Sequence, residues 1–211
     1  MKFDELLASV GDEAVFDAAL LKVGSVTDAA LYLQLARWTR AGKLVQLRRG
    51  VYALGPPYRK REPHSFMVAN ALRRGAYVSL HSALAYHGMI PEAVPVVTSV
   101  TTGRSEHLNS PLGSFLFRHV KAACFFGYEL AELGAGQSSF VATPEKALLD
   151  LVYLTPGADK RSYLRELRLQ NLEAVRPDIL EEFAARMNKP KINRAVKNLN
   201  ALFQEEAYED L

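Results

Sequence analysis

The sequence predicts an α+β protein in which helical and strand-like segments change in proportion along the chain. Three observations indicate this class. Residues 1–43 place apolar side chains at helical spacing, and residues 44–142 contain several short runs rich in β-branched and aromatic residues. Residues 143–211 return to helical spacing. We therefore expect helices at both ends of the chain and a mixed domain between them.

Two short helices are predicted first. The apolar residues of Phe3–Val10 fall on one helical face, and Gly11 ends that segment. A second apolar stripe runs from Val15 to Val23, and Gly24 follows it as a C-terminal stop. Both helices are short enough to form one small N-terminal unit.

A third helix is predicted from Thr27 to Ala41. Ser25 or Thr27 can accept a hydrogen bond from the free amides at its start, and Asp28 suits the positive end of the helix dipole. Helical spacing directs one set of apolar residues inward and leaves an alanine-rich, basic face outside. The inward set is Leu31, Leu35 and Trp38, and the outer set is Ala29, Leu33, Ala36, Arg37 and Arg40.

A β-hairpin with a basic tip is predicted next. Residues 44–54 contain two short apolar runs on either side of Arg48, Arg49 and Gly50. Glycine supplies the positive φ that a tight hairpin turn requires, so the two arginines are placed at the tip. A helix followed by a two-stranded ribbon with a cationic tip is the layout of a winged helix-turn-helix, a module that binds duplex DNA.

Basic residues are concentrated in this part of the chain. The whole chain has a net charge of only +3, whereas residues 37–61 hold eight basic side chains and no acidic one. Such a cluster is the electrostatic footprint of a nucleic-acid-binding face. The predicted DNA-binding residues are Thr27, Arg37, Arg40, Lys43, Arg48, Arg49, Arg59, Lys60 and Arg61.

These residues do not carry the prediction equally. Taken alone, Arg37 and Arg40 are better explained as a solvated helix face, and the adjoining hairpin reverses that preference. For the run Arg59–Arg61, a solvated linker and an extra phosphate contact are equally good interpretations. The prediction therefore depends on the five basic residues from Arg37 to Arg49.

Breaks in the pattern predict three parts. Gly55, Pro56, Pro57 and Pro63 interrupt secondary structure and indicate a boundary near residues 55–64. We expect a DNA-binding domain at 1–58, a mixed α+β part at 59–142 and a helical part at 143–211. Strands are expected near residues 76–79, 95–102, 113–120, 124–130 and 138–142, with helices near 66–72 and 82–87 and from Thr143 onward.

The composition excludes several classes. Cys124 is the only cysteine, so an internal disulfide and a multi-cysteine zinc site are excluded. The acidic start of the chain does not resemble a signal peptide, and no apolar run is long enough to span a membrane. We expect a cytoplasmic protein without a membrane partner.

Several segments, in this order and spacing, resemble the AbiEi-type antitoxins of type IV toxin-antitoxin systems. The resemblance covers roughly residues 15–155. The segments are LARWTRAGKL at 35–44, LRRGVY at 47–52, YVSLHSAL at 77–84 with His87-Gly88, and ATPEKALLD at 142–150. Many relatives are basic just before the recognition helix, whereas residues 24–28 contain no arginine, so the preferred DNA sequence stays open.

The resemblance implies both a fold and a function. It implies a winged-helix domain that represses its own operon by binding repeats in promoter DNA. It also implies a C-terminal region that counteracts a co-encoded nucleotidyltransferase toxin, often in defence against phage, without a stable complex. The sequence shows no heptad pattern that would form a coiled-coil dimer. We therefore expect either a monomer or a weak dimer, and both can bind repeats in promoter DNA.

The remaining motifs do not predict an enzyme. Gly24-Ser25 resembles part of the toxins' own motif but lacks the paired carboxylates that hold metal ions. His81 and His87 do not share a helical face, and Glu145 and Asp150 are likewise separated, so both pairs are interpreted as structural. Cys124 has apolar neighbours and is expected to be buried and inert. We expect no catalytic residue, metal or cofactor.

Two other functions stay open from the residues. A winged helix also serves as a docking surface for proteins, and a transcription factor without antitoxin activity has the same layout. A cationic hairpin can bind RNA as well, which a comparison of DNA and RNA of the same sequence would distinguish.

Overall fold

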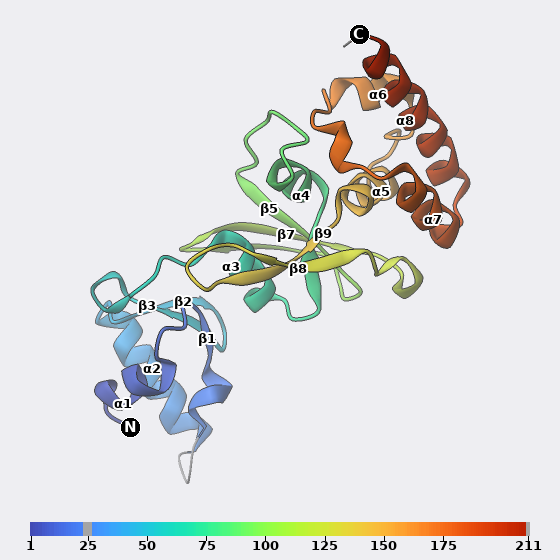
Figure 1. The fold of residues 1–211 in the computed structure, drawn as a ribbon. Helices are drawn as coiled ribbons and strands as arrows, with labels where there is room; N and C mark the ends of the chain where they lie inside the picture. The colour runs from blue at the N-terminus through green and yellow to red at the C-terminus, as the bar shows by residue number, and fades with distance from the viewer. Residues whose placement is uncertain (23–26, 210–211) are drawn as a thin grey trace.

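The computed structural model of the protein describes residues 1–22 and 27–209 and has the predicted α+β fold. Figure 1 shows three consecutive parts: an N-terminal unit of helices and a small sheet, a central sheet with helices, and a C-terminal group of helices. Within the described ranges, no helix is both long and apolar enough to cross a membrane.

The N-terminal unit contains two α-helices, a 3-10 helix and a three-stranded antiparallel sheet in the order β1-β3-β2. Its first helix, its third predicted helix and its hairpin are confirmed. The elements are α1 (Phe3–Val10), β1 (Phe16–Asp17), η1 (Ala18–Leu21), α2 (Asp28–Arg40), β2 (Leu44–Arg48) and β3 (Val51–Leu54).

The predicted second helix is wrong. Phe16 pairs with Tyr52 in β3, and the backbone amide of Ala18 donates to the carbonyl of Gly50 at 2.8 Å. The open edge of the hairpin thus takes this segment as a third strand, and tertiary pairing overrides its helical spacing. The helical turn that follows is only η1, and Val23, Gly24 and Ser25 lie outside the described residues.

The central part is a six-stranded mixed sheet in the order β6-β7-β5-β4-β9-β8, with α3 (Ser65–Leu72) and α4 (Leu80–Tyr86) against it. The short η2 (Pro56–Tyr58) precedes it. Its strands are β4 (Ala76–Val78), β5 (Val96–Thr101), β6 (Glu106–Ser110), β7 (Gly113–His119), β8 (Tyr128–Glu132) and β9 (Ser138–Ala142).

Two segments of this sheet differ from the prediction. Residues 124–130 do not form one strand, because η3 (Ala122–Cys124) comes first and β8 begins only at Tyr128. The edge strand β6 was not predicted, since its sequence is mostly polar and lacks β-branched residues. It forms because β7 supplies an antiparallel partner.

The C-terminal part is helical, as predicted. Thr143 caps the first of its helices by accepting from the amide of Lys146 at 3.4 Å, and Pro144 occupies the first helical position. The elements are α5 (Pro144–Leu154), α6 (Arg161–Glu166), η4 (Leu172–Ala174), α7 (Pro177–Met187) and α8 (Pro190–Glu209).

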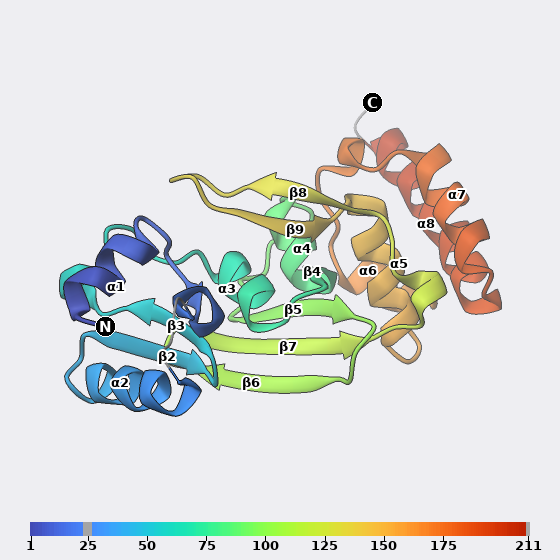
Figure 2. The ribbon, with the colours of Figure 1, turned by 90° about the horizontal axis from the view of Figure 1, so that it is seen from below.

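Two hydrophobic clusters fill the molecule, and the small sheet belongs to both. The N-terminal cluster joins α1 and α2 to Phe16 and Tyr52. The main cluster runs through the other two parts and includes Leu47, Val51 and Ala53 of the hairpin. All four residues of β3 are buried for this reason. In Figure 2 the hairpin lies beside α3 and β6, which cover its second face.

Candidate nucleic-acid interface

Helix α2 begins and packs as its sequence predicts. The hydroxyl of Thr27 accepts from the amide of Ala30 at 3.4 Å, and Leu31, Leu35 and Trp38 are buried in the N-terminal cluster. The outer face combines small, apolar and basic side chains that can approach a groove closely. Its exposed residues include Ala29, Ala30, Leu33, Arg37 and Arg40.

Three cations lie at the end of α2. Within the described part of the chain, neither Arg37 nor Arg40 forms an ion pair, and both are exposed. Lys43 is half-buried, with its Nζ 4.6 Å from the centre of the Phe3 ring. That contact supports the side chain without neutralising its charge. All three cations are therefore placed to meet an anion.

The hairpin turns at Gly50, whose φ is +86°, and the two arginines before it separate. Arg49 is exposed at the tip, whereas Arg48 ends β2 and its Nη1 donates to the carbonyl of Leu72 at 2.6 Å. The last carbonyls of a helix lack partners within the helix, so Arg48 completes the end of α3. Of the two arginines predicted at the tip, Arg49 is exposed there, whereas Arg48 is engaged with the end of α3.

The side chain of Arg59, in the linker, binds other groups of the protein. Its Nε donates to the carbonyl of Leu54 at 3.1 Å, its guanidinium pairs with Glu62, and its side chain is only 7% exposed. A group so enclosed cannot reach a phosphate. Arg59 fastens the linker to the end of β3.

The next two linker cations also have protein partners. Lys60 lies 2.7 Å from Asp12, and Arg61 donates to the carbonyl of Ala135 at 2.7 Å. The hydrogen bond and charge of Lys60 hold the pKa of the Asp12 carboxyl below its ordinary value. Lys60 and Arg61 thus have protein partners that Arg37, Arg40 and Arg49 lack among the described residues.

Residues that sequence reasoning did not select lie beside the hairpin tip. The hydroxyl of Tyr32 would be 3.9 Å from a Cβ placed on Gly50. Arg74, in the turn between α3 and β4, lies 3.0 Å from Asp17 of β1. The only sequence signal for Arg74 is a basic turn, because its position depends on packing between distant segments.

Glu145 and Asp150, which were considered as a catalytic pair, both contact other groups of the protein. Asp150 accepts hydrogen bonds from Tyr77 at 2.9 Å and Ser79 at 2.8 Å and pairs with Lys146, and this polar network is buried. Glu145 instead accepts from the amide of Arg176 at 2.8 Å. The two acids thus have separate partners, as their spacing predicts.

His81 and His87 are partly buried. His87 donates from Nε2 to the carbonyl of Ala142 at 2.8 Å, and Cys124 is buried as predicted. Burial lowers the pKa of His81 from its ordinary value. Among the described residues, no three side chains of the metal-ligating types come together.

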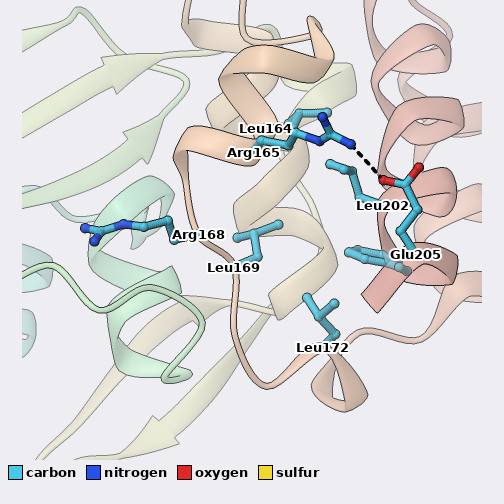
Figure 3. A pocket seen from close by; sticks show the side chains of 8 residues that line it. Leu164, Arg165, Arg168, Leu169, Leu172, Leu202 and Glu205 are labelled. Carbon is cyan, nitrogen blue, oxygen red and sulfur yellow. Dashed lines mark hydrogen bonds and ion pairs between the residues drawn. The ribbon is translucent and has the colours of Figure 1, made fainter. Parts of the chain in front are cut away.

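Two of the hollows in the described part of the chain lie away from the basic face. Figure 3 shows one of about 240 Å³ at α6 and α8, where Arg165 pairs with Glu205 at 3.1 Å and Arg168 points away toward Glu92. The other, of about 420 Å³, is mainly apolar and lies between the loop before β5 and the sheet, beside His81. Neither adds an unpaired cation to the interface.

Comparison with known proteins supports the fold alone. No family model and no curated protein matches the chain. The chain has an α+β fold that also occurs in a solved structure, the RV2827C protein from Mycobacterium tuberculosis. That structure matches with a TM-score of 0.52 and 17% identity over 93% of this chain and 75% of the other.

Proposed function

We propose that the N-terminal unit is a winged helix-turn-helix that binds duplex DNA. The order α1, β1, η1, α2, β2, β3 supports this proposal, because β1 pairs with β3 and leaves the β2–β3 hairpin as a wing beside α2. In this arrangement α2 enters the major groove and the wing lies over the neighbouring backbone. The short η1 takes the place of the helix that normally precedes the recognition helix.

The observation that carries the proposal is the outer face of α2. Exposed alanines permit close approach, and Leu33, which is 52% exposed, can contact a thymine methyl group. Arg37 and Arg40 add charge at the far end of the helix, and Arg49 adds it at the wing. Phosphate contacts from these cations would set the orientation of the helix in the groove.

Salt dependence of DNA binding tests this proposal. Arg37, Arg40, Lys43 and Arg49 are the four predicted cations not engaged with protein acceptors or acids. We expect the slope of log affinity against log salt to be about −3 to −4, from about −0.9 per neutralised phosphate. Binding to duplex DNA from upstream of its own gene would be measured by fluorescence anisotropy. A wild-type protein that binds no duplex at low salt would refute the proposal.

We further propose that this DNA binding represses an operon and that the chain acts as an AbiEi-type antitoxin. The order and spacing of the resembling segments support this proposal. Co-expression with a neighbouring nucleotidyltransferase gene tests it: growth should be restored by the chain, without stable co-purification of the two proteins. Continued growth arrest despite full expression of the chain would contradict antitoxin activity while leaving DNA binding intact.

A docking function for proteins is the second candidate. Leu20 and Leu33 are 65% and 52% exposed in the N-terminal unit, and exposed large apolar side chains are common at protein interfaces. Failure to bind duplex DNA together with stable co-purification of the neighbouring gene product would favour this function. Stronger binding to RNA than to DNA of the same sequence would favour an RNA-binding protein instead.

A further inference from the structure

We infer that the central part of the molecule contributes a phosphate contact of its own, through Arg74 in the turn between α3 and β4. This inference rests on the proposed DNA binding by the N-terminal unit. It extends the interface from the winged helix onto the second part of the chain. The partner is the sugar-phosphate backbone that passes the hairpin tip.

Two contacts link the end of α3 and the turn after it to the N-terminal sheet. Arg48, at the end of β2, donates to the carbonyl of Leu72, two residues before Arg74. Arg74 reaches Asp17 of β1, and the residue after Asp17 bonds to the carbonyl of Gly50 in the hairpin turn. These contacts place the α3–β4 turn beside the N-terminal sheet, at the end where the hairpin turns.

Arg74 remains available to a phosphate. Its side chain is 76% exposed, and Asp17 is 30% exposed, so the pair between them is screened by water and contributes little to folding. A phosphate oxygen offers the same charge and geometry as a carboxylate to a guanidinium. Arg74 can thus exchange Asp17 for a phosphate group of DNA.

The local charge balance also favours an anion. Lys22 pairs with Asp28 at 2.8 Å and Arg74 pairs with Asp17 at 3.0 Å, whereas Arg48 and Arg49 have no acidic partner among the described residues. An approaching phosphate group would meet Arg49 first and compete with Asp17 for Arg74. Arg49 and Arg74 would then both hold the backbone beside the wing. Such contacts fix the register of the protein and do not read base sequence.

The test compares salt slopes for duplex DNA among variants of the full chain. We expect Arg74→Ala to reduce the steepness of the slope by about 0.9, the value for one phosphate contact, and Arg74→Lys to restore most of it. The matched control is Arg165→Ala, an exposed arginine that also pairs with a carboxylate but lies in the C-terminal helices. Its slope should equal that of the wild type. Thermal melting would show that each variant is folded.

A second pair of variants tests the competition with Asp17. Asp17→Asn removes the carboxylate charge and keeps an oxygen for the amide of Ala19, so it should tighten DNA binding at low salt. In an Arg74→Ala background, the same change should tighten binding less. If the wild type binds DNA and Arg74→Ala keeps its slope, the inference is wrong and the proposed function stands. If the wild type binds no DNA, both are wrong.

Discussion

At the scale of single residues, the most constrained charge in the protein is the buried pair of Lys146 and Asp150. Both side chains have no exposed surface, and Asp150 also accepts hydrogen bonds from Tyr77 and Ser79. Taking two charges out of water is costly, and their attraction offsets that cost only when the remaining polar atoms are bonded. The two hydroxyl donors meet this condition for Asp150.

Removing one member of the pair should therefore be severe. Lys146→Met keeps the volume and leaves Asp150 buried without its counter-charge, so we expect the free energy of unfolding to fall by about 3 to 5 kcal/mol. Urea denaturation would measure it. The control, Lys22→Met, removes the cation of an exposed pair and should leave the midpoint near that of the wild type. Equal midpoints for the two variants would contradict the proposed role of the buried pair.

At the scale of secondary-structure elements, the turn between α2 and β2 fits closely against the end of β3. The amide of Gly55 donates to the carbonyl of Lys43 at 2.8 Å. A Cβ on Gly55 would lie 2.1 Å from the carbonyl oxygen of Gly42, which is far inside contact distance. Glycine at this position therefore permits the approach of two backbones.

A methyl group at this position should disturb the hairpin. We expect Gly55→Ala to lower the free energy of unfolding by about 1 to 3 kcal/mol, the usual range for overpacking, because backbone must shift to make room. Gly103→Ala is the control, since its added Cβ would meet its nearest neighbours at 3.5 Å, an ordinary contact. Chemical denaturation of both proteins measures the difference. A Gly55 variant as stable as the Gly103 variant would show that the turn is not tightly packed.

The sequence predicts elements whose signals are local. The helix Phe3–Val10 and the strand Ser138–Ala142 occur at the residues expected from their patterns. The segment after Val15 and the strand β6 do not follow their patterns, since a neighbouring strand determines the structure of each. Local pattern and tertiary pairing compete, and pairing prevails where the local preference is weak.

In the candidate site, too, some features follow from the local sequence and others depend on tertiary contacts. Exposure of Arg37 and Arg40 follows from the helical period of α2, which the sequence contains. The partners of Arg48 and Arg61 are the carbonyls of Leu72 and Ala135, distant in the chain. A count of basic residues cannot show which cations such carbonyls engage.

At the scale of the whole molecule, strand β3 connects the two hydrophobic clusters. Tyr52 and Leu54 face the N-terminal cluster, whereas Val51 and Ala53 face the main one. The run of four apolar residues in β3 is the sequence signal for burial on both faces. Because the second part of the chain covers one face of the small sheet, the N-terminal unit depends on it for stability.

This dependence predicts that the N-terminal unit does not unfold alone. Trp38 is the only tryptophan and lies in the N-terminal cluster, so its fluorescence reports that unit, while far-UV ellipticity reports all helices. We expect the two signals to change at the same urea concentration. Leu35→Ala removes side-chain atoms from the N-terminal cluster only and should lower stability by about 2 to 5 kcal/mol. In a coupled molecule its effect appears in both signals equally, whereas a fluorescence midpoint that falls while the ellipticity midpoint stays would show two independent units.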